Sequence, residues 1–595
     1  MKKLLKYFLA IAGGAMLCLF VLIFMLIKAV GSFSLSEMTT VPAKAVLHID
    51  MAKISLAEQS MENPVAFLEG RENTNFLGIR DAVEAINIAA TDPQIQYIYL
   101  KPDQVSGGLA HVEELRNALL KFRNSKPVIA YMETPGNGGY YLGSAADKIY
   151  MCSTMGAGSR LTGLSSQLFF IKDLLARLGI KVQLIRAGKY KSAGEMFIRS
   201  NISRENREQN EAMLHSIWNM WCEQIEASRG IKVQDFNALL DELKLNNASD
   251  FLRAGLVDEL VNKEQMDEKL CILYGCHDKR QIEAISLQNY AKIKCQPNLL
   301  AQDKIAILYA DGDMLDKASL QATTPEIVGD DFARLIREIR QDSSIKAVVL
   351  RVNSPGGSVL AADKIKVELD ALKKVKPVVA SYGNYAASGG YWISSGCQQI
   401  FTNHSTLTGS IGVFSMVPDL SGTLKNVLHV GSASIKTNKH ADMTSTARSL
   451  DKAEIEYLQK GVNEIYDGFI SLVAEGRNLG KDYVGEIAQG RVWSGVESLQ
   501  RGLTDQIGDL GDALSYAASI ANGDNGSDLS LWQIVSYPAA ADWKTNLLNS
   551  LQMMNGEEEI FTGTPLQGCL SSLRTWKESD HTKAYARLPF EYVIH

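Results

Sequence analysis

The second half of the chain alternates short apolar runs with amphipathic stretches. Residues 304–310 (KIAILYA), 346–355 and 377–383 are nearly continuous apolar runs, which are typical of buried strands. Between them, residues 330–342 and 361–375 place apolar side chains at helical spacing. Apolar strands that alternate with helices are typical of a parallel sheet covered by helices. The pattern therefore predicts an α/β fold.

The first half of the chain repeats this pattern. Three pairs of segments resemble each other: 126–151 and 376–402, 105–122 and 354–374, and 254–260 and 501–507. The offset between the members of a pair stays between 247 and 250 residues. Such a constant offset indicates a duplicated unit. We predict two homologous domains in tandem, over residues 44–295 and 300–545, followed by a tail over 546–595.

The N-terminus carries an apolar stretch without charges, residues 7–27. As a helix these 21 residues would span about 30 Å, which is enough to cross a bilayer. The stretch is longer than the core of a cleaved signal peptide. Lys2, Lys3 and Lys6 precede it, and such a flank favours a cytoplasmic N-terminus. We therefore expect residues 1–28 to be a transmembrane anchor, with lipid contacts over 7–27 and both domains on the outer face.

Charge and cysteine content narrow the classes of partner. The net charge is −6, so the chain lacks the basic character typical of nucleic-acid-binding proteins. Its eight cysteines are scattered, and the one cluster, Cys271, Cys276 and His277 with Cys295 nearby, lacks the paired short spacings of a zinc site. We expect thiols or one disulfide there, with no metal and no cofactor.

One serine stands out among small residues. Ser388 lies in NYAASGGYW (384–392), and NSPGG (353–357) follows the preceding predicted strand. Ligands of such sheets bind beyond the carboxyl ends of the strands, and glycines there can direct backbone N–H groups at an oxyanion. We expect an exposed serine nucleophile. It needs a base, yet no histidine lies within ten residues of it.

Several ordered motifs resemble the signal peptide peptidase A family, also called protease IV. They are RVNSPGGSVLAADKI (351–365), NYAASGGYWIS (384–394), STLTGSIGVF (405–414) and AQGRVWSGVESLQRGL (488–503). The resemblance covers roughly residues 40–540. It implies two Clp/crotonase-like domains with parallel-rich sheets, in the long, membrane-anchored form of the family.

The resemblance implies a Ser/Lys dyad, with Ser388 of the second copy as nucleophile and Lys191 of the first copy as general base. Comparison of the two copies supports a divided site. Aligning the GGY motifs places Asn137 opposite Ser388, and aligning IRAGKYK with IKTNKHA places Ala441 opposite Lys191. Each copy would keep one half of the site. A base must be neutral, and burial in an apolar pocket lowers the pKa of a lysine.

The remaining site residues follow from the same motifs. The oxyanion donors are expected to be the backbone N–H of Gly389 and that of Gly356 or Gly357. The Ser410 hydroxyl is expected to orient the lysine amine.

The resemblance further implies a serine endopeptidase that degrades remnant signal peptides, which are apolar segments left in the bilayer. Its domains would lie on the periplasmic side of the inner membrane, and the family assembles as a homotetramer. Two alternatives stay open: a crotonase-like acyl-CoA enzyme, which uses similar glycine donors, and a catalytically inactive membrane-anchored scaffold or chaperone.

Overall fold

The structure is a computed structural model that describes residues 40–61, 75–158, 160–319, 324–522, 527–539 and 583–588. The predicted anchor, residues 7–27, lies outside these ranges. Within them, no helix is both long and apolar enough to span a bilayer.

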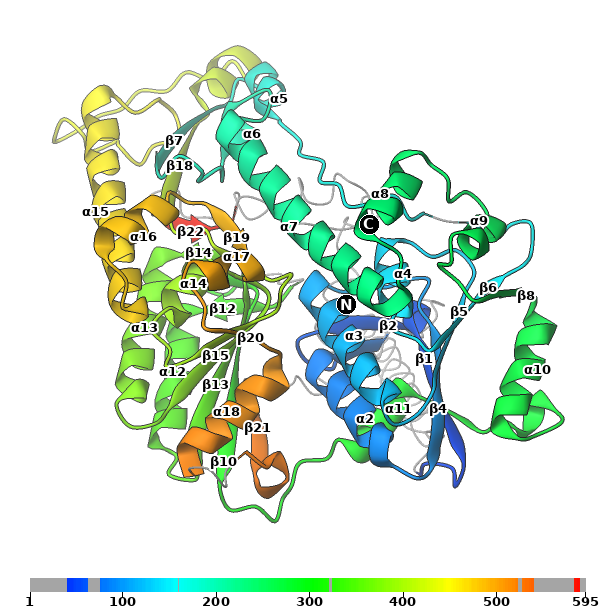
Figure 1. Cartoon of the computed structure of the whole chain (residues 1–595). Helices are drawn as coiled ribbons and strands as arrows, with labels where there is room; N and C mark the ends of the chain where they lie inside the picture. The colour runs from blue at the N-terminus through cyan, green and yellow to red at the C-terminus, as the bar shows by residue number, and fades with distance from the viewer. Residues whose placement is uncertain are drawn as a thin grey trace, which may run out of the picture.

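Each half of the chain builds one sheet (Figure 1). The first sheet is parallel throughout and has the order β8 (Glu259–Val261), β6 (Lys148–Cys152), β5 (Val128–Met132), β4 (Ile95–Lys101), β1 (Ala45–Asp50) and β9 (Ala284–Ser286). The second has the order β19 (Val492–Ser494), β17 (Leu407–Gly409), β15 (Val378–Ala387), β13 (Ile345–Ser354), β10 (Lys304–Asp311) and β21 (Gln533–Tyr537). Its pairs are parallel except β17 with β19. The predicted α/β class is confirmed.

Helices cover both faces of the second sheet. They are α12 (Gly329–Gln341), α13 (Val359–Lys373) and α18 (Leu510–Asn522). In β10, Ile305 and Ile307 are buried in a cluster with α18, whereas Ala306 and Leu308 are buried in a cluster with α12 and α13. Successive side chains of a strand point to opposite faces, so a strand covered on both faces must be apolar throughout. This explains the continuous apolar runs, and the strands and helices predicted between residues 304 and 383 are confirmed.

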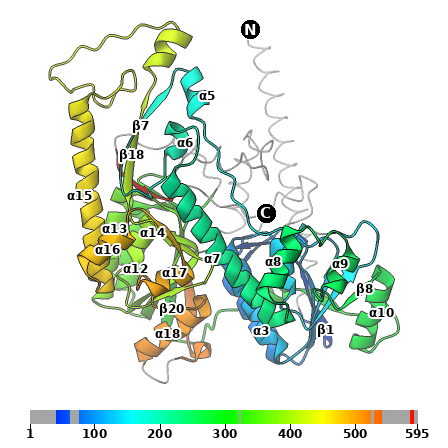
Figure 2. The same ribbon diagram turned by 45° about the horizontal axis from the view of Figure 1, so that its top comes forward.

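A third sheet joins the two halves. Its order is β12 (Glu326–Val328), β11 (Asp313–Leu315), β14 (Gly356–Ser358), β22 (Tyr585–Arg587), β18 (Val413–Asp419) and β7 (Lys181–Ala187). Strand β7 comes from the first half and pairs antiparallel with β18 along its full length. Strand β22 comes from the tail and pairs antiparallel with β14. The long helix α7 (Arg204–Arg229) then runs from this sheet back towards the first domain (Figures 1 and 2).

A buried ion cluster also connects the halves. Arg351 of β13 has a fully buried side chain and donates from Nε to Glu58, at 2.7 Å, and from Nη2 to Glu114, at 2.9 Å. Glu58 follows β2 (Ile54–Ala57), and Glu114 lies on α3 (Leu109–Arg123). Both carboxylates thus belong to the first domain, while the guanidinium belongs to the second. Burial opposes ionisation, but the charges of Arg351 and His111 lower the pKa of Glu58 to about 2.

Replacing Arg351 should destabilise the chain strongly. In Arg351→Met the two carboxylates stay buried without their cation, so we expect a loss of about 3–5 kcal/mol of unfolding free energy, measured by denaturant titration. Arg334→Met removes an exposed arginine paired with Asp331 and Glu338 and should cost less than about 1 kcal/mol. Equal effects of the two substitutions would contradict a structural role for the buried cluster.

Candidate active site

Ser388 occupies a sharp turn between β15 and α14 (Gly389–Ser394). Its φ of 56° is unusual for a residue other than glycine, and such strain concentrates at functional sites. The Ser388 amide donates to the Gly409 carbonyl at 2.8 Å, which holds the turn against the next strand. The serine is fully buried. The expectation of an exposed serine is therefore wrong, because Lys191, Ser410 and neighbouring segments close over it.

The structure brings Lys191 to this serine. Lys191 Nζ lies 2.8 Å from Ser388 Oγ, 3.0 Å from Ser410 Oγ and 3.1 Å from the Ser410 carbonyl oxygen. All three residues are fully buried. The predicted dyad residues and the predicted auxiliary serine thus meet at one point, although the sequence separates Lys191 from Ser388 by 197 positions.

Burial changes the chemistry of the lysine. Loss of solvation holds the pKa of Lys191 well below its usual value, because no water stabilises the ammonium form. A neutral amine has two N–H donors and one lone pair. The two oxygen atoms of Ser410 can accept the N–H groups, which leaves the lone pair for the Ser388 hydroxyl. The geometry can therefore transfer the serine proton to the amine.

Strand β7 positions Lys191, which lies four residues after the end of the strand. It ends at Ala187, which pairs with Val413 of β18, and the chain then turns at Gly188 (φ 102°). Beyond this turn, the Tyr190 amide donates to Gln489 at 2.8 Å, and Gln209 of α7 donates to the Tyr190 carbonyl at 3.0 Å. The segment before Lys191 is thus fixed from both halves of the chain.

Two further glycines make room for the lysine. A Cβ built on Gly412 would lie 3.1 Å from Lys191 Cδ, and one on Gly490 would lie 2.6 Å from the Lys191 backbone nitrogen. Both glycines belong to motifs that carry the family resemblance, TLTGSIG and AQGRV. Sequence reasoning assigned them no role, because only the folded chain shows that these loops pack against a residue of the other half.

Glycine amides surround the turn as expected. Gly389 is the first residue of α14, where backbone N–H groups have no partner within the helix. A Cβ built on Gly356 would lie 2.6 Å from the Gly389 nitrogen, so these two backbones touch. The Gly356 amide itself donates to Ser354 Oγ at 3.2 Å. Of the two predicted alternatives, Gly357 is therefore the better placed second donor.

The tail strand β22 lies beside these amides. Leu588 donates to the Pro355 carbonyl at 2.7 Å, and Val359 donates to the Ala584 carbonyl at 3.3 Å. Hydrogen-bonded pairs occur at every second residue of an antiparallel ladder. Gly357 and Ala586 lie midway between the two pairs just named and therefore form the next hydrogen-bonded pair. The Ala586 carbonyl oxygen also lies against Gly356 and Gly389. If these glycines carried a Cβ, it would lie 2.1 Å and 3.2 Å, respectively, from that oxygen. A backbone carbonyl of the tail thus lies against the glycines predicted to bind an oxyanion.

The first copy carries no serine in the equivalent turn. At the position of Ser388 it carries Asn137, whose Oδ1 accepts the amides of Thr162 and Gly163, both at 3.0 Å. The expected pairing of Lys191 with Ala441 has no structural counterpart, because residues 435–441 form an exposed loop without a strand. Ala441 is therefore not the structural equivalent of the lysine.

The predicted cysteine cluster holds no disulfide. Cys271, Cys276 and Cys295 are free thiols, and so are the other cysteines that the structure describes, Cys152, Cys222 and Cys397. Of the two expectations for this cluster, thiols are confirmed for these residues.

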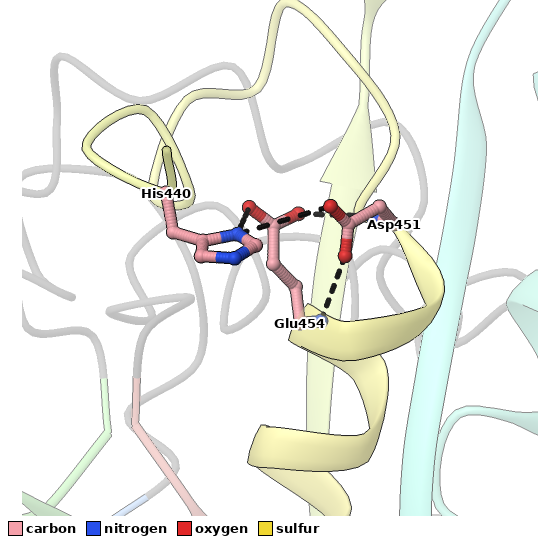
Figure 3. Close-up of side chains that lie close together, drawn as sticks. All are labelled: His440, Asp451 and Glu454. Atoms are coloured by element: carbon pink, nitrogen blue, oxygen red, sulfur yellow. Dashed lines mark hydrogen bonds and ion pairs between the residues drawn. The ribbon is translucent and has the colours of Figure 1, made fainter. Parts of the chain in front are cut away.

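Another group of potential ligands, His440, Asp451 and Glu454, lies at the start of α15 (Lys452–Arg477) (Figure 3). Asp451 accepts the Glu454 amide at 2.9 Å and caps the helix. Glu454 accepts from His440, at 3.0 Å, and from Arg448 Nη2, at 2.7 Å. Hydrogen bonding to Arg448 lowers the pKa of Glu454 to about 2. Asp451 thus caps the helix, and Glu454 forms an ion pair with Arg448.

A buried serine and amine at the carboxyl end of a parallel strand, beside glycine amides, define a class of α/β protein suited to serine-dependent hydrolysis. Two segments, residues 121–275 and 370–523, each match the domain of a known protein family, Peptidase family S49. The chain belongs to this family of serine-type proteases and carries its domain twice, which confirms the tandem duplication.

Relatives of similar length support this assignment. Protease 4 of Haemophilus influenzae is 34% identical over 78% of this chain and 76% of its own length. Protease 4 of Salmonella typhi is 34% identical over 83% of this chain and 80% of its own length. Serine protease SPPA of Arabidopsis thaliana, a chloroplastic protein, is 32% identical over 73% of this chain and 64% of its own length. The resemblance to the protease IV family is confirmed.

Removing the amine should abolish peptide hydrolysis. Lys191→Ala should lower kcat/KM at least about 10³-fold. Lys191→Arg should fail as well, because a guanidinium stays protonated. The amine is a base only when neutral, so kcat/KM should rise with pH through its lowered pKa and level off above it.

Lys189→Ala is the matched control, because Lys189 is exposed and lies two positions away. It should keep most of the activity. Normal turnover in Lys191→Ala together with loss of turnover in Lys189→Ala would show that Lys189, and not Lys191, is the base.

Proposed function

We propose that this protein is a serine endopeptidase in which Ser388 is the nucleophile and Lys191 the general base. The observation that carries the proposal is the 2.8 Å contact between Lys191 Nζ and Ser388 Oγ inside a fully buried site. Burial lowers the pKa of the amine and so favours its neutral form, and a positioned neutral amine is what a serine hydroxyl needs in order to attack.

The proposed acylation step uses this geometry. Ser388 Oγ attacks the carbonyl carbon of the peptide bond while its proton moves to Lys191 Nζ. The negative charge on the carbonyl oxygen is stabilised by the amides of Gly389 and Gly357. When the C–N bond breaks, the leaving amine takes the proton from Lys191, and an ester between Ser388 and the substrate remains.

Deacylation uses the same groups. A water molecule gives a proton to Lys191 Nζ and attacks the ester carbon. The C–O bond then breaks, and Ser388 Oγ recovers the proton from the lysine. Ser410 keeps the amine directed at Ser388 throughout, because its two oxygen atoms accept the remaining N–H groups.

The substrate is an extended peptide. Strand β14 accepts β22 as an antiparallel neighbour, and a peptide can add to the same edge through main-chain hydrogen bonds. Ala586, whose carbonyl faces the glycine amides, is fully buried, so this position suits a small side chain. A folded protein cannot offer such a strand, which favours peptides as substrates.

The proposed setting is the periplasmic face of the inner membrane. The apolar stretch over residues 7–27 and its lysine flank support a single-pass anchor there. Apolar remnants of signal peptides are the substrates that such an anchor would bring close, and a homotetramer is the assembly that the family resemblance implies.

The alternatives explain less of the site. A crotonase-like acyl-CoA enzyme would use glycine donors but needs no buried serine–lysine pair. A catalytically inactive scaffold or chaperone would need neither the strained turn at Ser388 nor a desolvated amine beside it.

Replacing the nucleophile tests the proposed function. Ser388→Ala should lower kcat for apolar peptides at least about 10³-fold and should abolish labelling by a fluorophosphonate probe. Ser395→Ala is the control, because Ser395 is also buried and, within the described residues, its hydroxyl lacks a hydrogen-bond partner. Hydrolysis by Ser388→Ala within tenfold of the unmodified chain would rule out the proposed nucleophile.

Removing the tail strand tests the proposed substrate groove. A chain that ends at residue 582 should have a KM for peptides several-fold lower, because β22 no longer competes for β14, and kcat should change little. The synthetic peptide KAYARL, residues 583–588, should then inhibit competitively. An unchanged KM without inhibition would show that peptides bind elsewhere.

A further inference from the structure

We propose that the first copy keeps a working peptide-binding groove that holds an extended chain without cutting it. The inference rests on the proposed function only for its ligand class, an extended peptide. The groove lies around Gly107, Gly136 and Asn137, at the carboxyl ends of β4 and β5.

The helix starts fix the equivalence of the two copies. Helix α3 begins at Leu109 and α13 at Val359, 250 positions apart. This register makes Gly107 the counterpart of Gly357. Aligning the glycine pairs 107–108 and 356–357 would instead match Gly107 with Gly356. Backbone conformation supports the match with Gly357, because φ is 148° at Gly107 and 156° at Gly357. The first copy has therefore kept the unusual backbone of the proposed oxyanion donor although it has lost the serine.

The neighbouring strands correspond as well. In the second copy, β14 has β11 on one side, where Met314 pairs with Gly357, and β22 on the other. In the first copy, Ser106 pairs in the same parallel sense with Ser55 of β2. The opposite side of this segment borders a hollow of about 540 Å³. The hollow thus lies where the second copy holds a strand.

The backbone facing this hollow is available to a ligand. Within the described residues, no hydrogen bond engages the amides of Gly107 or Gly108. Both glycines line the hollow. An exposed strand edge with available amides recruits an extended peptide through main-chain hydrogen bonds.

The walls fit a peptide. Asp103 and Arg160, one acidic and one basic, line the hollow together with residues of the second domain that include Tyr385 and Leu407. Apolar side chains and a balanced pair of charges suit a mixed peptide better than a strongly charged ligand. Asn137 stands where the second copy has its serine, and the Ser405 hydroxyl in the lining donates to Glu113, so a bound strand would be retained.

Gly136 offers a direct way to fill the hollow. It lines the hollow, and a Cβ built there meets no atom within 4 Å. Gly156 provides the matched control, because its Cβ also meets no atom within 4 Å and it is exposed outside the hollow. Gly138, which also lines the hollow, provides a second filling variant, since its Cβ would make only ordinary contact with Val105, at 3.7 Å.

The test measures binding of fluorescein-labelled KAYARL to the full chain carrying Ser388→Ala, by fluorescence anisotropy. We expect saturable binding that Gly136→Leu weakens at least tenfold and Gly156→Leu leaves unchanged. Gly138→Leu should act like Gly136→Leu, which covers the case that one filling variant fails to fold, as judged by thermal unfolding. Equal binding by the filling variants and the control, or no binding by the parent, would overturn the inference. Failure of the proposed function would instead appear as absence of Ser388-dependent hydrolysis, which this assay does not use.

Discussion

The pairing of β7 with β18 is the interaction on which the contact between Lys191 and Ser388 depends. It is the point where a strand of the first copy enters a sheet of the second, and its register sets the position at which the chain turns towards Ser388. Shifting that register by one residue would move each side chain of β7 to the other face of the sheet. The lysine contact therefore rests on backbone pairing, and the Arg351 cluster secures the same two halves at a second place.

Burial of the lysine and docking of the two copies are coupled. The lysine is desolvated because the second copy packs around it: Ser410 contacts the amine, Gly412 lies against the side-chain stem, and Gly490 lies against the backbone. Separating the halves would expose it to water, and its pKa would return towards about 10.4. The lowered pKa is thus a property of the assembled structure. A partly unfolded chain would contain both Ser388 and Lys191, but its lysine would be protonated at neutral pH.

The sequence predicted the α/β class, the duplication and the residues that meet at the site. Those predictions used local signals: apolar runs, a repeat with a constant offset, and short glycine-rich motifs. What it did not predict depends on contacts between distant segments. The roles of Gly412 and Gly490 appear only when Lys191 lies against them, and the burial of Ser388 requires the other half of the chain. The tail strand β22 was equally hidden, because three residues that add to a sheet edge have no periodicity of their own.

The two copies contain different parts of the site. The second copy holds the serine, the glycine amides and a bound strand, while the first holds the lysine and a groove with the same backbone conformation at Gly107. Losing a nucleophile requires one side-chain change, whereas the φ of 148° can be kept only by glycine without strain. Packing also requires a glycine at this position, because a Cβ built on Gly107 would lie 2.8 Å from Leu56 Cβ, but it does not require the open hollow beside that backbone. The proposed peptide-binding groove accounts for that hollow, which packing leaves unexplained.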